Sequence, residues 1–197
     1  TLADWYPNIK FIKINRYNDG RDKVNGPIEE WNKRTNITSK NIVIATGSTV
    51  ASLPGIKINE KNIVSSTGAL SFEKVPSKLA VIGGGYIGLE MGSVWTRLGS
   101  EVTVIEYLDY ITPGMDREIS NEFQKILSKQ GIKFKMGSKV ESVKDQGKSV
   151  KISYTNVKNS KKEILEVEKV LLSVGRKPYT EGLNLSKVGI KKDNKGR

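Results

Sequence analysis

A run of three glycines, with a fourth glycine three residues later, has the type and spacing that point most directly to chemistry. Gly83, Gly85 and Gly88 fit the pattern G-x-G-x-x-G, and Gly92 follows one helical turn later. The first glycine permits a turn that a Cβ atom could obstruct, the second lets a phosphate approach the backbone, and the third lets a helix lie close to a sheet, with Gly92 expected to help. Because a helix start leaves N–H groups without partners, this loop is suited to binding the diphosphate of a dinucleotide.

An acidic residue follows the glycines at a distance that suits the same ligand. Glu106 closes the next apolar run and lies 106 − 88 = 18 residues after Gly88, near the roughly 20 residues expected for a ribose-binding carboxylate. A carboxylate there accepts hydrogen bonds from ribose hydroxyls and repels a 2′-phosphate, which favours NAD over NADP. The alternative interpretation is a plain strand–turn–helix with packing glycines and a surface glutamate.

Strands and helices are predicted on both sides of the glycines. A strand is expected over residues 79–82, a helix from Tyr86 to Gly99, and a second strand over residues 102–105. The apolar face predicted for this helix consists of Ile87, Met91, Val94, Trp95 and Leu98. Pro113 and Asp116 open a second helix, which Gly131 ends. Its predicted apolar face consists of Ile119, Phe123, Ile126 and Leu127.

Short strands follow the second helix. They are expected over residues 132–136, 139–143, 150–154, 164–167 and 170–174, several of them antiparallel. The chain is therefore predicted to be α/β, a Rossmann-like domain with a parallel sheet, helices and an inserted β-meander. Nearer the start, a buried strand over residues 40–44 is expected to feed a tight loop at Thr46, Gly47 and Ser48, and Ile9, Phe11, Ile12 and Ile14 predict another strand.

Composition excludes several kinds of site. The 197 residues carry a formal charge of +12 and contain neither cysteine nor histidine. Disulfides, cysteine-based zinc sites, thiol nucleophiles and a Ser-His-Asp triad are therefore excluded within these residues, and we predict no catalytic and no metal-binding residue. Lys and Arg are scattered without interleaved aromatic residues, so we expect a solvated surface and no nucleic-acid partner. No apolar stretch reaches the ~20 residues that span a bilayer, and no membrane partner or signal peptide is predicted.

Over residues 41–189 the chain resembles the flavoprotein disulfide reductases, and among them the enzymes that reoxidise protein-bound dihydrolipoamide. The matching segments, in order, are IATGS at 44–48, VSSTGAL at 64–70, KVP at 74–76, the glycine loop, GSVW at 92–95, MDREI at 115–119, KQG at 129–131 and VGRKP at 174–178. The resemblance implies that electrons pass from the dithiol to a redox disulfide, then to FAD and then to NAD+. It also implies an FAD domain and an NAD domain.

The resemblance assigns residues to two cofactors. Thr46, Gly47 and Ser48 match positions that contact FAD, although they could instead be turn formers. The positions that match the NAD site are Gly83, Gly84, Gly85, Tyr86, Ile87, Gly88, Leu89, Glu90, Glu106, Val140 and Gly175. Tyr86 stands where a related reductase has a gating tyrosine, and Glu90 matches a glutamate near the nicotinamide and flavin. Alternatively, Tyr86 is a surface aromatic residue and Val140 a core residue.

Several parts of the family pattern are absent from this sequence. The N-terminal FAD fingerprint, the redox cysteine pair and the C-terminal histidine–glutamate pair are missing. We therefore expect a central fragment that is not catalytically complete. Its expected parts are residues 1–68 from the FAD domain, residues 69–177 as the NAD domain and residues 178–197 as a return segment.

The resemblance also implies partners and a location. The whole protein is expected to serve the 2-oxo acid dehydrogenase complexes and the glycine cleavage system through their lipoyl domains, and to form a homodimer. The expected location is the mitochondrial matrix, or the cytoplasm if the source is bacterial.

Two alternatives stay open from the sequence. One is an NADP-dependent reductase similar to glutathione reductase, which carries arginine where Glu106 stands; residues 107–110 contain no arginine. The other is a non-catalytic basic module that binds nucleic acid through the +12 charge.

Overall fold

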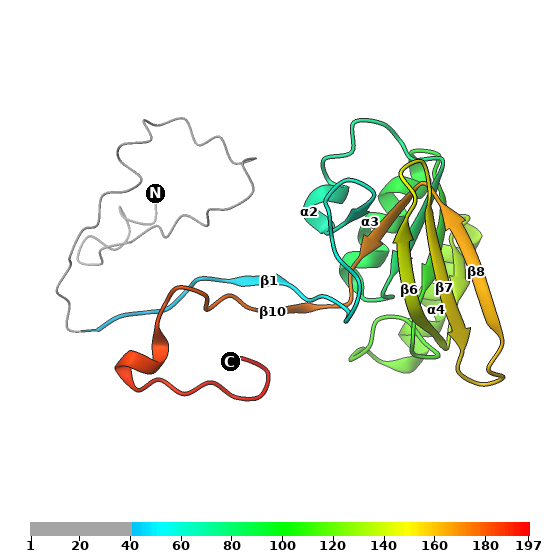
Figure 1. Ribbon diagram of the computed structural model, residues 1–197. Helices are drawn as coiled ribbons and strands as arrows, with labels where there is room; N and C mark the ends of the chain where they lie inside the picture. The colour runs from blue at the N-terminus through cyan, green and yellow to red at the C-terminus, as the bar shows by residue number, and fades with distance from the viewer. Residues whose placement is uncertain (1–40) are drawn as a thin grey trace, which may run out of the picture.

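A five-stranded parallel sheet forms the centre of the molecule. The computed structural model describes residues 41–197 (Figure 1), so the strand predicted at residues 9–14 lies outside the described residues. The strands, in sheet order, are β2 (Ile63–Val64), β9 (Lys169–Leu172), β3 (Lys78–Ile82), β4 (Glu101–Ile105) and β5 (Lys133–Lys135). Each neighbouring pair is parallel, which confirms the predicted α/β class.

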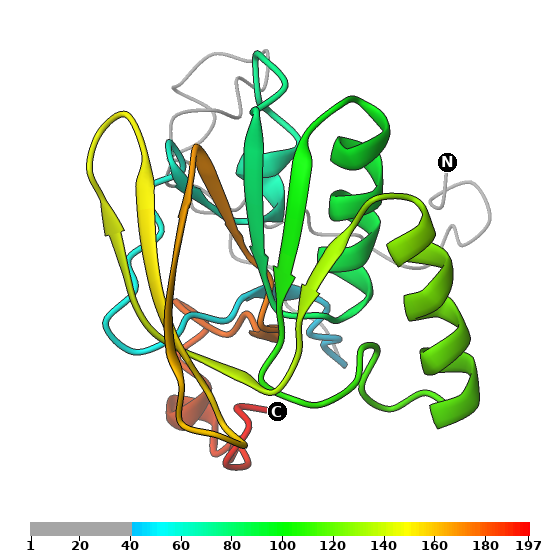
Figure 2. The same cartoon turned by 90° about the vertical axis from the view of Figure 1, so that its right-hand side faces the viewer.

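Helices cover one face of this sheet and an antiparallel ribbon covers the other (Figure 2). The helices are α2 (Ser66–Ala69), α3 (Tyr86–Arg97) and α4 (Arg117–Lys129), and α3 and α4 connect β3 to β4 and β4 to β5. The ribbon consists of β6 (Ser138–Asp145), β7 (Val150–Asn156) and β8 (Lys162–Val167), paired in that order. It is the predicted meander, inserted between β5 and β9 of the parallel sheet.

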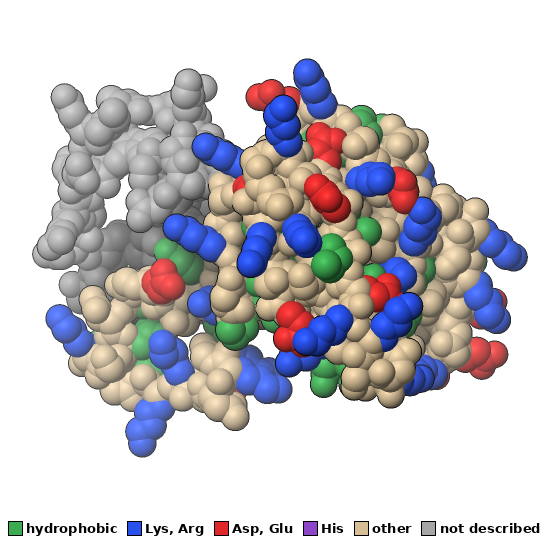
Figure 3. Space-filling view, turned by 45° about the vertical axis from the view of Figure 1, so that its right-hand side comes forward, with side chains coloured by type: hydrophobic (Ala, Val, Ile, Leu, Met, Phe, Trp, Pro, Cys, Tyr) green, Lys and Arg blue, Asp and Glu red, His purple; other side chains and the backbone are tan. Residues whose placement is uncertain are grey.

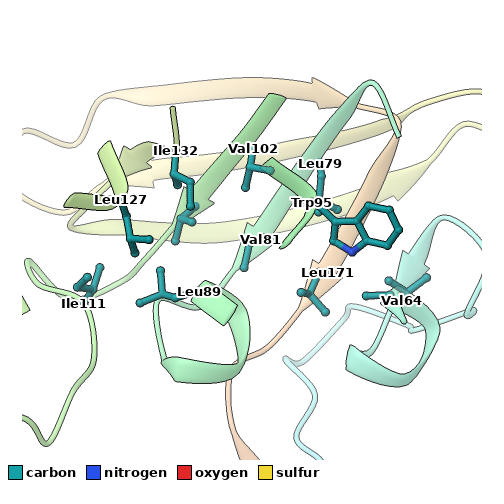
Figure 4. Packing of buried hydrophobic residues seen from close by; sticks show 12 residues of the cluster. Val64, Leu79, Val81, Leu89, Trp95, Val102, Ile111, Leu127, Ile132 and Leu171 are labelled. Carbon is teal, nitrogen blue, oxygen red and sulfur yellow. The ribbon is translucent and has the colours of Figure 1, made fainter. Parts of the chain in front are cut away.

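Alternating residues of the central strands supply two hydrophobic cores. Leu79 and Val81 of β3 pack on the helical side with Leu89, Trp95 and Leu127 (Figure 4). On the ribbon side a second cluster contains Ala80, Ile82, Ile105, Val150, Ile152, Tyr154 and Leu172. Both faces of the sheet are therefore buried, as the near-continuous apolar sequence of its strands indicates.

The helical faces differ from the predicted ones. On α3 the buried residues are Gly88, Leu89, Gly92 and Trp95, whereas Val94 and Leu98 are exposed. On α4 only Ser120 and Leu127 are buried, and Ile119, Phe123 and Ile126 are exposed. The predicted faces are thus wrong except at Trp95, Leu127 and the half-buried Ile87 and Met91. The physical reason on α3 is that two of its buried positions are glycines, which a search for large apolar residues passes over.

A two-stranded link extends from the main body (Figure 1). It pairs β1 (Ser48–Val50) with β10 (Arg176–Pro178) in antiparallel register, and a short 3-10 helix, η2 (Leu185–Val188), follows. The buried strand predicted up to residue 44 is wrong, because residues 41–47 form no strand and the side chains of Ile42 and Val43 are 81% and 88% exposed. Within the described residues, pairing with β10 begins only at Ser48, so the apolar run before it has no neighbouring strand.

The expected division of the chain falls inside α2. The boundary between residues 68 and 69 follows β2, which already pairs with β9 of the parallel sheet. Assignment of residues 1–68 to an FAD part, of 69–177 to an NAD part and of 178–197 to a return segment remains a prediction.

Candidate dinucleotide-binding site

A cavity of about 770 Å³ opens where α3 begins and where β3, β4 and β9 end. Ligands of parallel α/β sheets bind at this carboxyl edge of the strands. The glycine loop and the ends of β4 and β9 supply much of the lining, together with β6 of the ribbon. The lining includes Gly83, Gly85, Tyr86, Ile87, Glu106, Tyr107, Val140, Ser173, Gly175 and Arg176.

Two glycines of the loop are required by close contacts. Gly83 has a φ of +108°, and a Cβ atom there would lie 2.5 Å from the carbonyl oxygen of Ser173. A Cβ atom on Gly88 would lie 2.4 Å from the carbonyl oxygen of Gly83 and 2.5 Å from Oγ of Ser173. At Gly92 the nearest atom, Cγ1 of Val102, would be 3.5 Å away, an ordinary contact. The close approach of α3 to the sheet therefore depends on Gly88, and the help expected from Gly92 is not needed.

Gly85 leaves the N-terminus of α3 open. It is the N-cap residue, with an extended backbone and no side-chain capping bond, and a Cβ atom there would meet nothing within 4 Å. The first N–H groups of a helix have no intrahelical partner, and the helix dipole makes this end electropositive. The open space beside Gly85 is part of the cavity, so an anionic group can approach these N–H groups.

Glu106 holds a carboxylate against the glycine loop, beside Gly84. Its side chain is 8% exposed; one oxygen accepts a hydrogen bond from the N–H of Gly84 at 2.5 Å and the other from the N–H of Leu108 at 2.8 Å. Each carboxylate oxygen has a second lone pair. The group is therefore fixed in orientation and can still accept hydrogen bonds from a ligand in the cavity.

The ribbon that forms the far wall is fastened to the parallel sheet by polar contacts. The amide nitrogens of Asn62 and Asn59 donate to the carboxylate of Asp145 at 3.0 Å and 2.8 Å. The hydrogen bond from Asn62, followed by that from the N–H of Gly147, lowers the pKa of Asp145 below its usual value. These contacts hold the β6–β7 turn against the loop before β2.

A second fastening lies on the ribbon's other edge. The hydroxyl of Tyr154 donates to Glu163 at 2.8 Å, and Nζ of Lys135 on β5 lies 3.1 Å from the same carboxylate oxygen. The bond from Tyr154 and then Lys135 lower the pKa of Glu163, whereas burial is the main cause that raises the pKa of Tyr154. The ribbon is thus held to the sheet at both edges, which keeps Val140 on the cavity wall.

The structure gathers most of the residues predicted to contact NAD. Gly83, Gly85, Tyr86, Ile87, Glu106, Val140 and Gly175 all line the cavity. Gly84 lies behind it, bonded to Glu106, and Gly88 lies between α3 and the sheet.

For three of the residues predicted to contact NAD, the position of the side chain does not by itself indicate a ligand contact. The side chain of Leu89 belongs to the helical core, so any contact from it to a ligand in the cavity would have to come from its backbone. Glu90 is exposed and outside the lining. Tyr86 is 74% exposed at the cavity's rim, compatible with both the gating and the surface interpretation.

The three residues predicted to contact FAD lie at the start of the two-stranded link and are not among the lining residues. The hydroxyl of Thr46 donates to the carbonyl oxygen of Tyr179 at 2.5 Å, and the carbonyl oxygen of Gly47 accepts from the N–H of Tyr179 at 2.9 Å. Oγ of Ser48 accepts from Nε of Arg176 at 2.6 Å. These contacts join the two strands of the link, so an FAD contact at Thr46, Gly47 or Ser48 stays a prediction.

Sequence reasoning missed several lining residues. Tyr107 follows Glu106 directly, and Ser173 and Arg176 follow β9. Their signal was positional: residues just after parallel strands gather at one edge of a sheet. Leu53 and Pro54 also line the cavity, but they come from an irregular segment whose path no periodicity reveals.

Lys and Arg side chains are spread among Asp and Glu on the face shown in Figure 3, with no continuous basic patch there. Among residues 41–197 no group of three or more His, Cys, Asp or Glu could hold a metal ion. The same residues contain no helix with the length and apolar character that a bilayer crossing requires.

Comparison with known proteins identifies the family. The profile of the family described as pyridine nucleotide-disulphide oxidoreductase matches residues 6–197. The chain belongs to this family. Membership supports binding of a pyridine nucleotide and a flavin, and it confirms the resemblance and the fold class predicted from the sequence.

Within this family, the chain is similar in sequence to dihydrolipoamide dehydrogenases. Dihydrolipoamide dehydrogenase of Chaetomium thermophilum is 60% identical over 164 residues, which cover 83% of this chain and 32% of the relative. The mitochondrial dihydrolipoyl dehydrogenase of Pisum sativum is 53% identical, covering 84% of this chain and 33% of the relative. The chain thus spans about a third of the length of these relatives, as expected for a fragment.

Solved structures of the family share the fold. The HOCl-induced flavoprotein disulfide reductase RclA of Escherichia coli superposes with a TM-score of 0.67 at 30% identity, covering 77% of this chain and 34% of that one. LpdA of Mycobacterium tuberculosis gives a TM-score of 0.68 at 25% identity, covering 77% and 32%.

Proposed function

We propose that this chain is the NAD-binding part of a dihydrolipoamide dehydrogenase and that the cavity at the start of α3 holds the dinucleotide. The observation that carries the proposal is the pairing of an open helix N-terminus at Gly85 with a fixed carboxylate at Glu106 on one cavity. The helix N-terminus suits an anion and the carboxylate suits a diol, and a dinucleotide presents both groups.

The diphosphate is assigned to the N-terminus of α3. Gly85 leaves space for a phosphate beside the backbone, and the open N–H groups of the first turn can donate to its oxygens. The positive end of the helix dipole adds to the attraction. Close packing at Gly88 fixes where this helix end lies relative to the carboxyl edge of the sheet.

The adenosine ribose is assigned to Glu106. Its two oxygens already accept one backbone N–H each, and their remaining lone pairs can accept the two ribose hydroxyls. A 2′-phosphate would bring negative charge against this nearly buried carboxylate, which is unfavourable. Preference for NAD over NADP follows.

The activity of the whole enzyme is proposed from the relatives. Dihydrolipoamide dehydrogenase oxidises protein-bound dihydrolipoamide and reduces NAD+, with a redox disulfide and FAD between them. This chain has no cysteine, so its own part is to bind and orient NAD, with FAD contacts proposed at Thr46, Gly47 and Ser48. We expect the isolated chain to be inactive towards dihydrolipoamide.

Partners and location belong to the same proposal. The whole protein would act on the lipoyl domains of 2-oxo acid dehydrogenase complexes and of the glycine cleavage system, as a homodimer. Relatives named as mitochondrial occur in Pisum sativum and Schizosaccharomyces pombe, which supports a mitochondrial matrix location if the source is eukaryotic.

The test is a calorimetric titration of the chain with NADH and with NADPH. NADH should bind with the higher affinity. Glu106→Gln should weaken NADH about 10- to 100-fold, because hydrogen bonds to a charged group contribute ~1.5–3 kcal/mol. Glu106→Arg should lower the affinity for NADH, so that the preference for NADH over NADPH becomes smaller or is reversed.

A matched control removes a carboxylate elsewhere. Glu118→Gln changes an exposed residue of α4 outside the cavity and should leave NADH affinity unchanged. Preference of the unmodified chain for NADPH would instead favour a glutathione reductase-like enzyme. Equal binding by the wild type and Glu106→Gln would remove the role assigned to the ribose carboxylate.

A further inference from the structure

Thr112 has an unfavourable backbone conformation beside the glycine loop. Its φ is +50°, its side chain is 5% exposed, and it directly precedes Pro113. A β-branched residue with positive φ is an outlier, and a following proline further restricts the backbone. Such conformations persist only where the surroundings over-determine them, and they cluster at ligand-binding sites.

Hydrogen bonds from three directions hold Thr112 in place. Its N–H donates to the carbonyl oxygen of Gly84 at 2.8 Å, and its carbonyl oxygen accepts from the N–H of Met115 at 3.1 Å. Its hydroxyl pairs with that of Ser120 on α4 at 2.8 Å. The buried Ser120 hydroxyl also contacts the carbonyl oxygen of Asp116 at 2.9 Å. Residue 112 therefore anchors the loop between β4 and α4 to the carbonyl group of Gly84.

The contact with Gly84 determines where the next amide points. The carbonyl group of Gly84 and the N–H of Gly85 belong to one peptide unit, and residues 41–197 contain no cis peptide bond. In a trans peptide these two groups point in opposite directions. With the carbonyl turned towards Thr112, the N–H of Gly85 is turned away from it, and Gly85 lines the cavity.

The preceding peptide unit, which joins Gly83 and Gly84, is fixed as well. The N–H of Gly84 donates to the carboxylate of Glu106, so Gly84 is held at its nitrogen by one strand end and at its oxygen by the loop. Neither contact uses a side chain of the glycine pattern itself. Residues 106 and 112, which lie outside that pattern, thus hold both backbone groups of Gly84.

We propose that Thr112 is a positioning residue for the diphosphate of the bound dinucleotide. Its left-handed backbone and its hydroxyl bond to Ser120 hold the Gly84 carbonyl, which directs the Gly85 N–H into the cavity before a ligand arrives. The proposal rests on the proposed function, because it takes the ligand to carry a diphosphate at the start of α3. It distinguishes residue 112 from Glu106, whose assigned contact is with the ribose.

The experiment compares Thr112→Val with Thr112→Asn on the full chain. Valine keeps the shape but loses the hydroxyl, and it does not favour positive φ, whereas asparagine adopts positive φ more readily and keeps a polar group. Affinities are measured for NADH and for adenosine, which has the ribose but no diphosphate, and thermal unfolding is recorded alongside. Thr112→Val should lower the affinity for NADH about 10-fold, the scale of one lost hydrogen bond, and change the affinity for adenosine by no more than about twofold. Thr112→Asn should largely restore the affinity for NADH.

Ser120→Ala provides a second route if Thr112→Val does not fold. It removes the hydroxyl partner and leaves residue 112 unchanged, and it should weaken NADH by a smaller factor with adenosine again unaffected. Equal NADH affinity in the wild type and in both variants would overturn the positioning role, and so would a loss that falls equally on NADH and adenosine. A wild-type chain that binds no NADH would overturn the proposed function itself, which is a different result.

Discussion

The two long helices of the domain begin in opposite ways. α4 is capped by its own sequence, because the side chain of Asp116 accepts hydrogen bonds from the N–H groups of Glu118 and Ile119 at 2.8 Å and 3.3 Å. α3 begins at Gly85, which has no side chain to accept such bonds and which faces the cavity. One helix closes its electropositive end itself, and the other leaves it open to the cavity.

The helices also differ in how they meet the rest of the protein. α3 lies close to β3 through Gly88, where even a methyl group has no room, and it buries Leu89 and Trp95. α4 buries only Ser120 and Leu127. Amphipathic sequence alone therefore does not determine a helix's depth of burial, and the helix that carries the proposed site is the one fixed more tightly.

The largest expected effect concerns the few buried contacts of α4. Leu127→Ala should destabilise the fold by about 2–5 kcal/mol, the usual range for a buried leucine. Ile126→Ala, one residue away and 51% exposed, should change stability by no more than about 0.5 kcal/mol. Chemical denaturation measures both, and comparable losses at the two positions would show that the exposed face of α4 is covered in solution.

The next effect tests the close packing of α3. Gly88→Ala places a methyl group against the carbonyl oxygen of Gly83 and should cost about 1–3 kcal/mol, with NADH affinity falling as the helix end moves. Gly92→Ala meets only ordinary contacts and should be neutral or stabilising by up to about 1 kcal/mol, from helix propensity. Denaturation curves that rank the two alanines in the reverse order would contradict the packing account.

A smaller effect separates capping from binding. Asp116→Ala should cost about 1 kcal/mol of stability and leave NADH affinity unchanged. Gly85→Ser adds a capping side chain to α3, so stability should stay equal or rise by a few tenths of a kcal/mol, while NADH affinity falls because the hydroxymethyl group enters the space beside the N–H groups. Unaltered NADH binding by Gly85→Ser would mean that the open end of α3 is not where the diphosphate lies.

The smallest expected effect on stability concerns Asp145, which holds the ribbon against the loop before β2 and lies away from both helix ends. Hydrogen bonds from Asn62 and Gly147 lower the pKa of Asp145. The stabilisation from this carboxylate is therefore complete above its ordinary pKa of 3.8 and is lost as the pH falls through the lowered value. The melting temperature of Asp145→Ala should lie slightly below that of the wild type at pH 7, and the difference should disappear in strong acid. If the difference in melting temperature instead became larger as the pH fell, the proposed stabilisation by the ionised Asp145 would be contradicted.

Much of the fold was predictable because parallel strands buried on both faces are nearly continuous apolar runs. Residues 79–82 and 102–105 predicted β3 and β4 within one residue, and Gly99 and Gly131 ended the helices as expected. The α3 face was predicted wrongly because Gly88 and Gly92 occupy part of its buried side, and glycines contribute nothing to apolar periodicity. The run at residues 42–44 was predicted wrongly because a strand also needs a partner, which local sequence does not reveal.

The candidate site was predictable where backbone chemistry dictates residue type. Gly83, Gly85 and Glu106 were predicted from a tight turn, a proposed phosphate approach and a proposed ribose contact, and all three line one cavity. Thr112 could not be predicted, because its contact with Gly84 uses a backbone N–H, which every residue except proline carries. Leu89 was assigned by likeness to the NAD site, but its position on the sheet side of α3 places its side chain in the core.

The most direct measurement is a crystal structure of the chain grown with NADH. We expect the diphosphate to lie against the N–H groups of Gly85 and the first turn of α3, with the adenosine ribose hydroxyls on the carboxylate of Glu106. A dinucleotide bound elsewhere, or a diphosphate whose oxygens contact lysine side chains and not the start of α3, would contradict this expectation.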